Sequence, residues 1–387
     1  MKKLFKSMVP VFFKKLYLIY NNRKVVNFFG SDFSKKVLIS YITTPFRKQS
    51  LEHSNYFEVM SAANIFDELG YQVDVIHYDS KSINLESYDV IYGFGDVFKW
   101  YFESGLVGRR TIYYGTGMHV CHQNSSTLKR VKDVFNKRGV WLAKSSRFVE
   151  KTWTHQTSLV DGIIALGNDE CKKTYEVHYD GPVIALPAPF YQIIDGTDII
   201  KGKKINESKS FLWFGSSGLI HKGLDLCLDY FSSRPDLTLY ICGNIYSEPE
   251  FVDEYYNELF NFPNIKVQGF VAIDSPKFKE LLQLCSFSIL PSCSEGGGVS
   301  VLTTVGNGGL IPIVSAETSI STGYEIEIKS LDYKGIEDAI FYAESLNDEG
   351  IFALRKNNLK FVINNHNQDV YYSRLKSSIE QVLNNAL

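Results

Sequence analysis

Residues 286–315 read SFSILPSCSEGGGVSVLTTVGNGGLIPIVS, and this stretch decides the fold. The apolar run at 286–290 is typical of a buried strand, and Pro291 ends it. Three glycines at 296–298 then precede an apolar segment of helical length, which stops at a second glycine pair before another apolar run. A strand, a glycine turn, a helix and a strand in this order predict one βαβ unit of a parallel sheet.

The glycine turn also offers a binding surface. Glycines at the start of a helix let the oxygen atoms of a ligand approach backbone N–H groups, where the helix dipole favours anions. Glu295 precedes these glycines and can accept hydrogen bonds from ligand hydroxyl groups. The structural alternative is a tight turn in which Glu295 merely caps the helix, and the glycines alone do not decide between the two.

A second segment of the same kind lies at 211–231 and reads FLWFGSSGLIHKGLDLCLDYF. An apolar strand again leads into a polar turn, which holds Ser216 and Ser217, and Lys222 precedes an amphipathic helix. Backbone N–H groups, two hydroxyls and an ammonium group suit a diphosphate. The alternative is a plain loop with a solvated lysine.

The rest of the chain alternates in the same way. Apolar runs predict strands at 37–42, 73–78, 90–92, 111–114, 162–166, 211–214, 237–242, 265–267, 286–290 and 311–314. Helical patterns fall at 55–69, 223–231 and 276–284, and two helices, at 336–347 and 368–385, close the chain. This rhythm predicts an α/β protein with two Rossmann-like halves joined near residue 200 and a cleft between their sheet edges.

Four segments follow from this pattern: a basic amphipathic extension at 1–30, an N-terminal domain at 31–200, a C-terminal domain at 201–365, and a helix at 366–387 that can cross back. The first 31 residues hold seven Lys or Arg and no acid. They contain no apolar run of the ~20 residues that span a bilayer. The extension either lies on an anionic membrane surface or is a solvated arm.

Composition excludes several other classes. Hydrophobic residues make up 44% and charged residues 22%, as in a globular protein. A net charge of −2 gives no support for a nucleic-acid partner. The six cysteines include no C-x-x-C pair, which argues for a reducing, cytoplasmic location, peripheral on the inner membrane face if the extension binds there.

The two segments, in this order, resemble the C-terminal domain of family 4 retaining glycosyltransferases of the GT-B fold. Lys222-Gly223 matches the family's diphosphate loop, and Glu295-Gly296 with GLIPIVS at 309–315 matches its sugar-binding segment. The resemblance implies that the donor site consists of Gly215, Ser216, Ser217, Gly218, Lys222, Phe270, Val271, Glu295, Gly296, Gly297, Gly298, Val299 and Thr303. It covers residues 205–320 well and the N-terminal half only loosely.

Two positions depart from the family pattern. Thr303 stands where the family has a second glutamate, and Ser216 stands where an arginine usually follows the first glycine of the phosphate loop. Neutral donors make weaker bonds to anions than cations do. These departures place the chain in a divergent branch.

Histidines in the N-terminal half complete the expected site. His119 ends TIYYGTGMH, so it should lie at the carboxyl edge of a strand, and it resembles the histidine that family members place beside the anomeric carbon. Glu295, His119 and Lys222 are thus the expected catalytic residues. His53 and His119 are the expected acceptor-side residues. Eight basic residues between 129 and 151 are either a solvated helix face or a surface for a phosphate-bearing acceptor.

The function implied by the resemblance is transfer of a sugar, with retention, from a nucleoside-diphosphate sugar to a glycan or lipid-linked acceptor. Together with the basic N-terminus, it favours the synthesis of a bacterial surface polysaccharide such as O-antigen or capsule. No D-x-D pair occurs, so no metal or other cofactor is expected. The alternatives are a sugar-nucleotide epimerase of the same fold and a non-catalytic glycan-binding or scaffold subunit.

Overall fold

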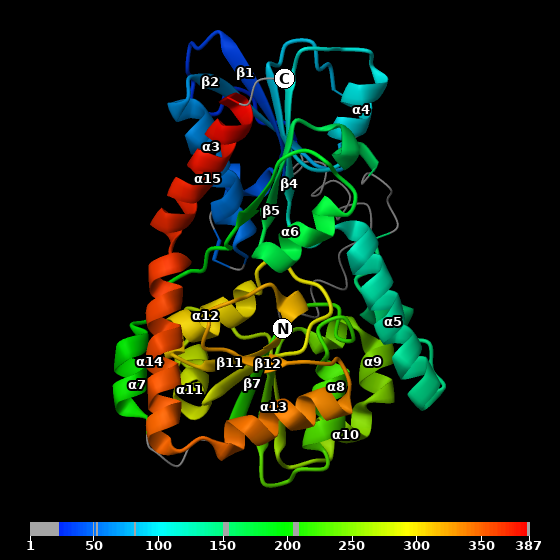
Figure 1. The fold of residues 1–387 in the computed structure, drawn as a ribbon, viewed down its shortest axis with the longest axis vertical. Helices are drawn as coiled ribbons and strands as arrows, with labels where there is room; N and C mark the ends of the chain where they lie inside the picture. The colour runs from blue at the N-terminus through cyan, green and yellow to red at the C-terminus, as the bar shows by residue number, and fades with distance from the viewer. Residues whose placement is uncertain are drawn as a thin grey trace.

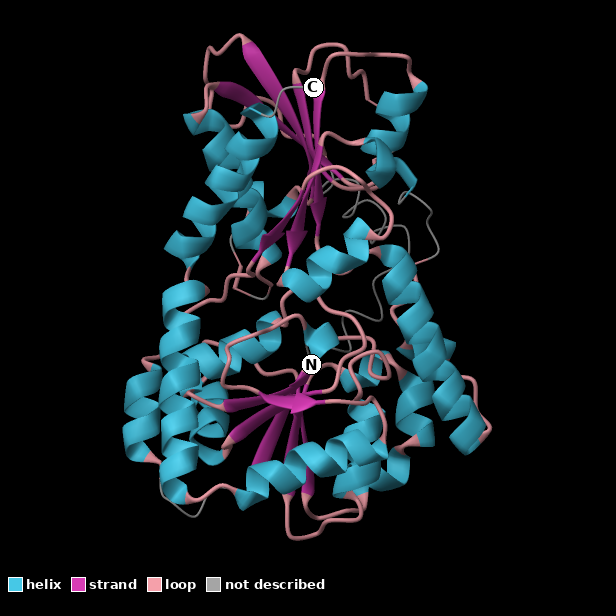
Figure 2. Cartoon of the chain, viewed as in Figure 1, coloured by secondary structure: helices cyan, strands magenta, loops and turns pink. Residues whose placement is uncertain are grey.

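The computed structural model describes residues 23–48, 50, 51, 53–80, 83–149, 155–203 and 209–384. The chain forms two halves, each built on a six-stranded sheet whose strands are all parallel (Figures 1 and 2). The predicted α/β fold with two Rossmann-like halves is therefore confirmed.

The first sheet has the order β2-β1-β3-β4-β5-β6. Its strands are β1 (Lys35–Tyr41), β2 (Tyr71–His77), β3 (Val90–Gly93), β4 (Arg110–Gly115), β5 (Gly162–Leu166) and β6 (Val183–Leu186). Alternate residues serve opposite faces: Val37 and Ile39 join one core cluster and Leu38 joins another. Burial on both faces explains why these strands are apolar throughout.

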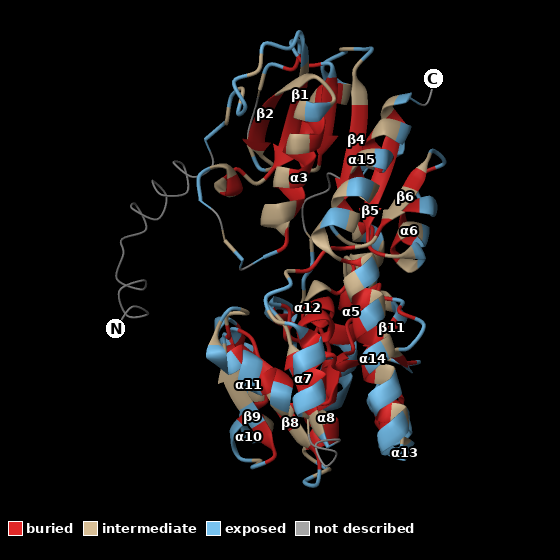
Figure 3. Cartoon of the chain, turned by 90° about the vertical axis from the view of Figure 1, so that its left-hand side faces the viewer, coloured by how far each residue is buried: buried red, intermediate tan, exposed pale blue. Residues whose placement is uncertain are grey.

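Helices cover both faces of this sheet. The cluster around Val37 includes buried residues of α3 (Asn55–Glu68) and α15 (Gln368–Asn384). The cluster around Leu38 includes residues of α4 (Val97–Glu103) and α6 (Asp169–Glu176). Figure 3 shows buried strands at the centre of each half and exposed helix surfaces on the outside.

The second sheet has the order β12-β11-β10-β7-β8-β9. Its strands are β7 (Ser210–Phe214), β8 (Thr238–Cys242), β9 (Ile265–Gly269), β10 (Phe287–Leu290), β11 (Ile311–Ser315) and β12 (Ile326–Ile328). The helices of this half are α7 (Gly196–Gly202), α8 (Leu224–Phe231), α9 (Pro249–Glu254), α10 (Tyr256–Phe260), α11 (Pro276–Leu284), α12 (Val299–Gly308), α13 (Tyr333–Ser345) and α14 (Asp348–Asn365). Because α7 packs on α12 and α14, the chain reaches this half before residue 196.

Helix α5 (Val120–Arg138) begins beside the first sheet and runs along the second half (Figure 1). Arg130 forms a buried ion pair with Asp225 of α8, 2.5 Å apart, and Arg138 bonds to Asp229 and Glu258 at 2.8 and 2.7 Å. Lys137 pairs with Asp229 as well, and Lys144 pairs with Glu250 of α9. The expected solvated face is thus, in large part, a charged seam between the two halves.

Helix α15 returns to the first half. Tyr371 and Tyr114 hydroxyls lie 2.9 Å apart, and Tyr372 and Lys376 donate to Glu68 of α3 at 2.6 and 2.7 Å. These contacts place α15 against the first sheet and α3.

The sequence prediction of two closing helices was wrong: three are present, because α14 separates α13 from α15. The inner face of α14 carries Arg355 and Asn358 among its apolar residues, which weakens the helical pattern. Strands β6 and β12 were also missed: both are short edge strands whose middle residues are not fully buried.

The basic extension lies largely outside the described residues, which begin at 23. Among the described residues, no helix has the length and apolarity needed to cross a membrane.

Candidate functional site

The centre of the site is an ion pair between the two predicted donor segments. Lys222 lies just before α8, and its ammonium group donates a hydrogen bond to Oε1 of Glu295, which follows β10. Ser292 donates to the same oxygen at 2.9 Å, and Nη1 of Arg147 lies 3.9 Å from Oε2. The structure therefore brings two of the three predicted catalytic residues together, and adds Arg147, one of the eight basic residues between 129 and 151.

Local backbone geometry explains this pairing. Gly223 has a φ of +67°, and a Cβ atom there would lie 2.2 Å from the carbonyl oxygen of Pro291. Glycine thus lets the start of α8 touch the end of β10. Trp213 Nε1 fixes the carbonyl of Lys222 at 3.2 Å, and the Glu317 carbonyl accepts the N–H of Glu295 at 2.8 Å.

Electrostatics keep the Glu295 carboxylate charged. Burial alone would raise the pKa of Glu295, but the positive charges of Lys222 and Arg147 outweigh it and lower that pKa to about 2. Burial lowers the pKa of Lys222, against the opposing effect of Glu295. At neutral pH Glu295 is therefore a carboxylate, and it lies beside the buried Lys222 side chain and the half-exposed Arg147 guanidinium.

Backbone N–H groups of the predicted phosphate loop are largely used within the protein. Glu248, a buried carboxylate, accepts from Gly218 at 2.5 Å and from Leu219 at 3.1 Å. The N–H of Gly215 donates to Cys242 at 2.9 Å. Ser216 and Ser217 are exposed at the end of β7. The expectation of free amides therefore does not hold at Gly215 and Gly218, and the N–H groups of Ser216 and Ser217 are the two in this loop without an acceptor among the described residues.

The glycine turn packs against the N-terminal half. A Cβ on Gly296 would lie 2.3 Å from the carbonyl oxygen of Thr116, and one on Gly297 would lie 2.6 Å from Cβ of Ala188. Thr116 follows β4 and Ala188 follows β6. Loops at the carboxyl ends of the two sheets thus meet here, and glycine is required for this close approach as much as for any ligand.

Remaining donor residues surround this centre. Gly298 caps α12, and Val299 is its first residue. Thr303 is buried, and its hydroxyl donates a hydrogen bond to the carbonyl oxygen of Val299 at 2.7 Å. Towards any other group, the Thr303 hydroxyl can therefore act only as an acceptor. Phe270 is exposed and Val271 is buried, just after β9. Their contacts with a donor stay predictions.

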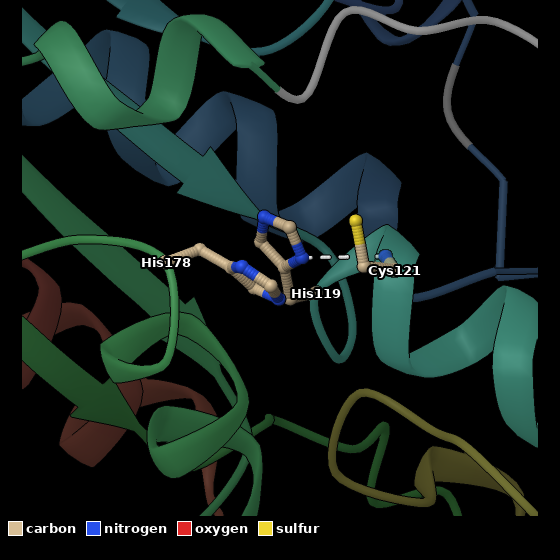
Figure 4. A group of neighbouring side chains, drawn as sticks. All are labelled: His119, Cys121 and His178. Atoms are coloured by element: carbon tan, nitrogen blue, oxygen red, sulfur yellow. Dashed lines mark hydrogen bonds between the residues drawn. The ribbon is translucent and has the colours of Figure 1, made fainter.

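His119 follows β4, as predicted, and caps α5. Its Nδ1 accepts from the N–H of Cys121 at 3.2 Å, and its ring stacks on His178 with 4.3 Å between centroids (Figure 4). Burial, together with His178, lowers the pKa of His119 to about 4. Because Nδ1 is an acceptor, the neutral ring carries its proton on Nε2, which is buried and has no partner among the described residues.

His119, Cys121 and His178 place possible metal-ligand atoms within 4.8 Å of one another. The N–H of Cys121 already occupies Nδ1 of His119, and the two imidazole rings are stacked. A metal ligand needs a free lone pair aimed at the ion. This arrangement suits a positioned hydrogen-bond donor better than a metal ligand.

His53 precedes α3 in the N-terminal half. Desolvation lowers the pKa of His53, and the charges that act on it include those of Glu58, Arg147, Lys222 and Glu295. His53 is exposed, and its Nδ1 accepts from the N–H of Asn55 at 3.1 Å. Its contact with an acceptor stays a prediction. From the sequence, Arg147 was named only as one of eight basic residues between 129 and 151, and it was not placed at the donor site. Ser292 and Glu248 were missed, and no local motif marks them.

Buried histidines predict a pH dependence of stability. Burial lowers the pKa of His221 and of His366 to about 4, from an unfolded value near 6.5. Their contribution to stability is complete above pH 6.5 and is lost as the pH falls toward 4, because only the unfolded state then binds their protons. Each of these histidines lowers the free energy of unfolding by about 1.4 kcal/mol for every pH unit below 6.5 within that window.

We therefore expect urea midpoints at pH 5.0 well below those at pH 7.5, with an unchanged m-value. His366→Gln should show a shallower pH slope than the wild type. Equal midpoints at the two pH values would contradict the assignment.

A recess of about 740 Å³ lies between α6 and the segments around β11 and β12. Residues that line it include Asn168, Glu170, Lys173, Ser315, Ile320 and Glu325. None of the predicted site residues is among its lining residues, so it is separate from the Lys222–Glu295 centre.

No model of a known protein family and no curated protein matches the chain. Solved structures do. A glycosyltransferase from Rickettsia africae matches with a TM-score of 0.56 and 12% identity over 92% of this chain and 100% of its own. Sucrose-phosphate synthase from Thermosynechococcus elongatus matches with a TM-score of 0.60 and 13% identity, over 90% of this chain and 99% of its own. Anabaena HepE, solved with UDP and glucose, matches with a TM-score of 0.56 and 12% identity, over 90% of this chain and 100% of its own.

These likenesses extend over both halves of the chain, and their identities are low. They therefore establish the fold alone. The chain has the two-sheet α/β fold of the GT-B glycosyltransferases.

Proposed function

We propose that this protein is a glycosyltransferase that takes a sugar from a nucleoside-diphosphate sugar. The observation that carries the proposal is the cluster of Lys222, Glu295 and Arg147 at the carboxyl ends of β7 and β10, beside the other half of a GT-B fold. In parallel α/β sheets, ligands bind at the carboxyl ends of the strands. The structural neighbour HepE supports the donor class, since it was solved with UDP-glucose.

Each residue has a chemical role in this proposal. The ammonium group of Lys222 balances charge that develops on the leaving diphosphate. The Glu295 carboxylate accepts hydrogen bonds from sugar hydroxyls and orients the ring. Neutral His119 offers its Nε2 proton near the loop that contacts Gly296. His53 and His119 serve the acceptor side.

We further propose a retaining reaction in which a phosphate oxygen of the donor accepts the proton of the acceptor hydroxyl. Side-chain cations would supply the charge that a metal supplies in other transferases. We therefore expect turnover to persist in EDTA. A rate that disappears in EDTA and returns with a divalent cation would contradict this part.

The acceptor that we propose is a glycan or lipid-linked glycan of a bacterial surface polysaccharide, O-antigen or capsule. Support comes from the basic N-terminus, with seven Lys or Arg and no acid in its first 31 residues. Such a segment suits contact with an anionic membrane surface.

The experiment is to incubate the protein with labelled UDP-, GDP- and dTDP-sugars, with and without a mixture of lipid-linked acceptors. We expect one donor to be hydrolysed slowly alone and consumed faster with acceptor. Product NMR should show the donor's anomeric configuration. Isomerised donor without acceptor would indicate an epimerase instead, and no consumption of any donor would favour a non-catalytic binding role.

A further inference from the structure

We propose that Arg147 is a donor-binding residue that contacts the phosphate group carrying the sugar. This inference rests on the proposed function and adds a residue to its site. Arg147 follows α5 in the N-terminal part of the sequence. Its side chain contacts Gly218 and Glu295, which belong to the C-terminal half.

Most backbone N–H groups around Lys222 already donate hydrogen bonds within the protein. From Gly218 to Gly223, every backbone N–H has an acceptor within the protein. Glu248 accepts from Gly218 and Leu219, and the Ser145 carbonyl accepts from Ile220 and His221 at 3.1 and 3.4 Å. The N–H groups of the next two residues complete turns of the loop. Of the backbone N–H groups from Gly215 to Gly223, only those of Ser216 and Ser217 have no acceptor among the described residues. An anion at this loop therefore needs side-chain donors as well, and it carries more charge than Lys222 alone can balance.

Several contacts fix the backbone of Arg147. Gln123 of α5 donates to its carbonyl at 2.5 Å, and Asn124 exchanges two hydrogen bonds of 2.8 Å with the backbone of Val149. Ser145, two residues earlier, is tied to the phosphate loop itself. A residue held on both sides in this way is preorganised for binding.

The side chain is directed at the site. Cγ of Arg147 would lie 2.4 Å from a Cβ placed on Gly218, so its methylene groups cover that glycine directly. The guanidinium lies 3.9 Å from Oε2 of Glu295, and 46% of the side chain is exposed. Arg147 thus keeps N–H groups accessible at the point where Glu295 faces the proposed sugar.

The position of Glu295 indicates which phosphate Arg147 contacts. A carboxylate that binds the sugar lies next to the phosphate to which the sugar is attached, which is the β-phosphate of the donor. Arg147 and Lys222 flank that carboxylate. A guanidinium binds phosphate through two parallel N–H groups, a geometry that an ammonium cannot reproduce.

The test compares a nucleoside diphosphate with its monophosphate by calorimetry. A panel of UDP, GDP, dTDP, CDP and ADP first identifies the diphosphate that the wild type binds best. Arg147→Ala should weaken binding of that diphosphate roughly 10- to 100-fold and change monophosphate binding by less than about threefold. Arg147→Lys should fall between, and Lys132→Ala, which removes an exposed cation of α5, should match the wild type.

Equal losses for diphosphate and monophosphate, or no loss for either, would overturn the role of Arg147 while leaving the proposed function in place. A wild type that binds no member of the panel would instead contradict the proposed function itself, and this inference with it.

Discussion

Glu295→Gln should lower kcat for sugar transfer about 100- to 1,000-fold, the loss typical when one preorganised hydrogen-bonding group of an active site is removed. The amide keeps the size of the side chain and its contact with Ser292, but it cannot balance the charges of Lys222 and Arg147. The measurement is initial-rate kinetics with the donor identified by the labelled panel.

Glu337→Gln is the matched control, because Glu337 is a half-exposed residue of α13 paired with Lys334. It should leave kcat unchanged. Circular dichroism at the assay temperature would check that Glu295→Gln is folded. A folded Glu295→Gln protein with wild-type kcat would remove Glu295 from the catalytic residues.

Arg130→Met should lower the free energy of unfolding by about 3–5 kcal/mol, because it leaves Asp225 buried without its charge partner. The side chains of Arg130 and Asp225 are only 4% and 2% exposed. Chemical denaturation gives the value directly. The pair joins α5 to α8, so its loss should also loosen the segment that carries Arg147.

A double variant, Arg130→Met with Asp225→Leu, separates the cost of an unpaired charge from the value of the pair. It should recover most of the stability lost in Arg130→Met, since apolar side chains of similar size replace buried ion pairs well. Lys334→Met, which breaks an exposed pair, should cost less than about 1 kcal/mol. A loss of similar size in Arg130→Met and Lys334→Met would contradict the buried-pair account.

The fold was largely predictable because its strands are buried on both faces and therefore stand out as apolar runs. The segment 286–290 illustrates this: the structure places β10 at 287–290 and opens α12 directly after the three glycines. Helix α14 escaped prediction because it buries Arg355, which bonds to Ser286, and Asn358, which bonds to Thr322. A polar residue that is buried with a hydrogen-bond partner looks like a surface residue in the sequence pattern, so the apolar face of such a helix is not recognised.

The site was predictable where it follows strand ends and glycine turns, as at Lys222 and Glu295. It was not predictable where it depends on contacts between distant segments. Arg147 reaches Glu295 only because α5 is fixed along the second half by its own ion pairs. Glu248 replaces the expected ligand on the loop amides for the same kind of reason. Tertiary packing, which no local spacing encodes, decides both.

Calorimetric titration of the wild type and of Lys222→Met with the nucleoside diphosphate panel tests the central claim most directly. Nucleotide binding at the Lys222–Glu295 centre predicts that one diphosphate binds the wild type with a Kd below 1 mM, and that Lys222→Met weakens it at least about tenfold. Binding of none of them below that concentration, or binding that Lys222→Met leaves unchanged, would contradict the account.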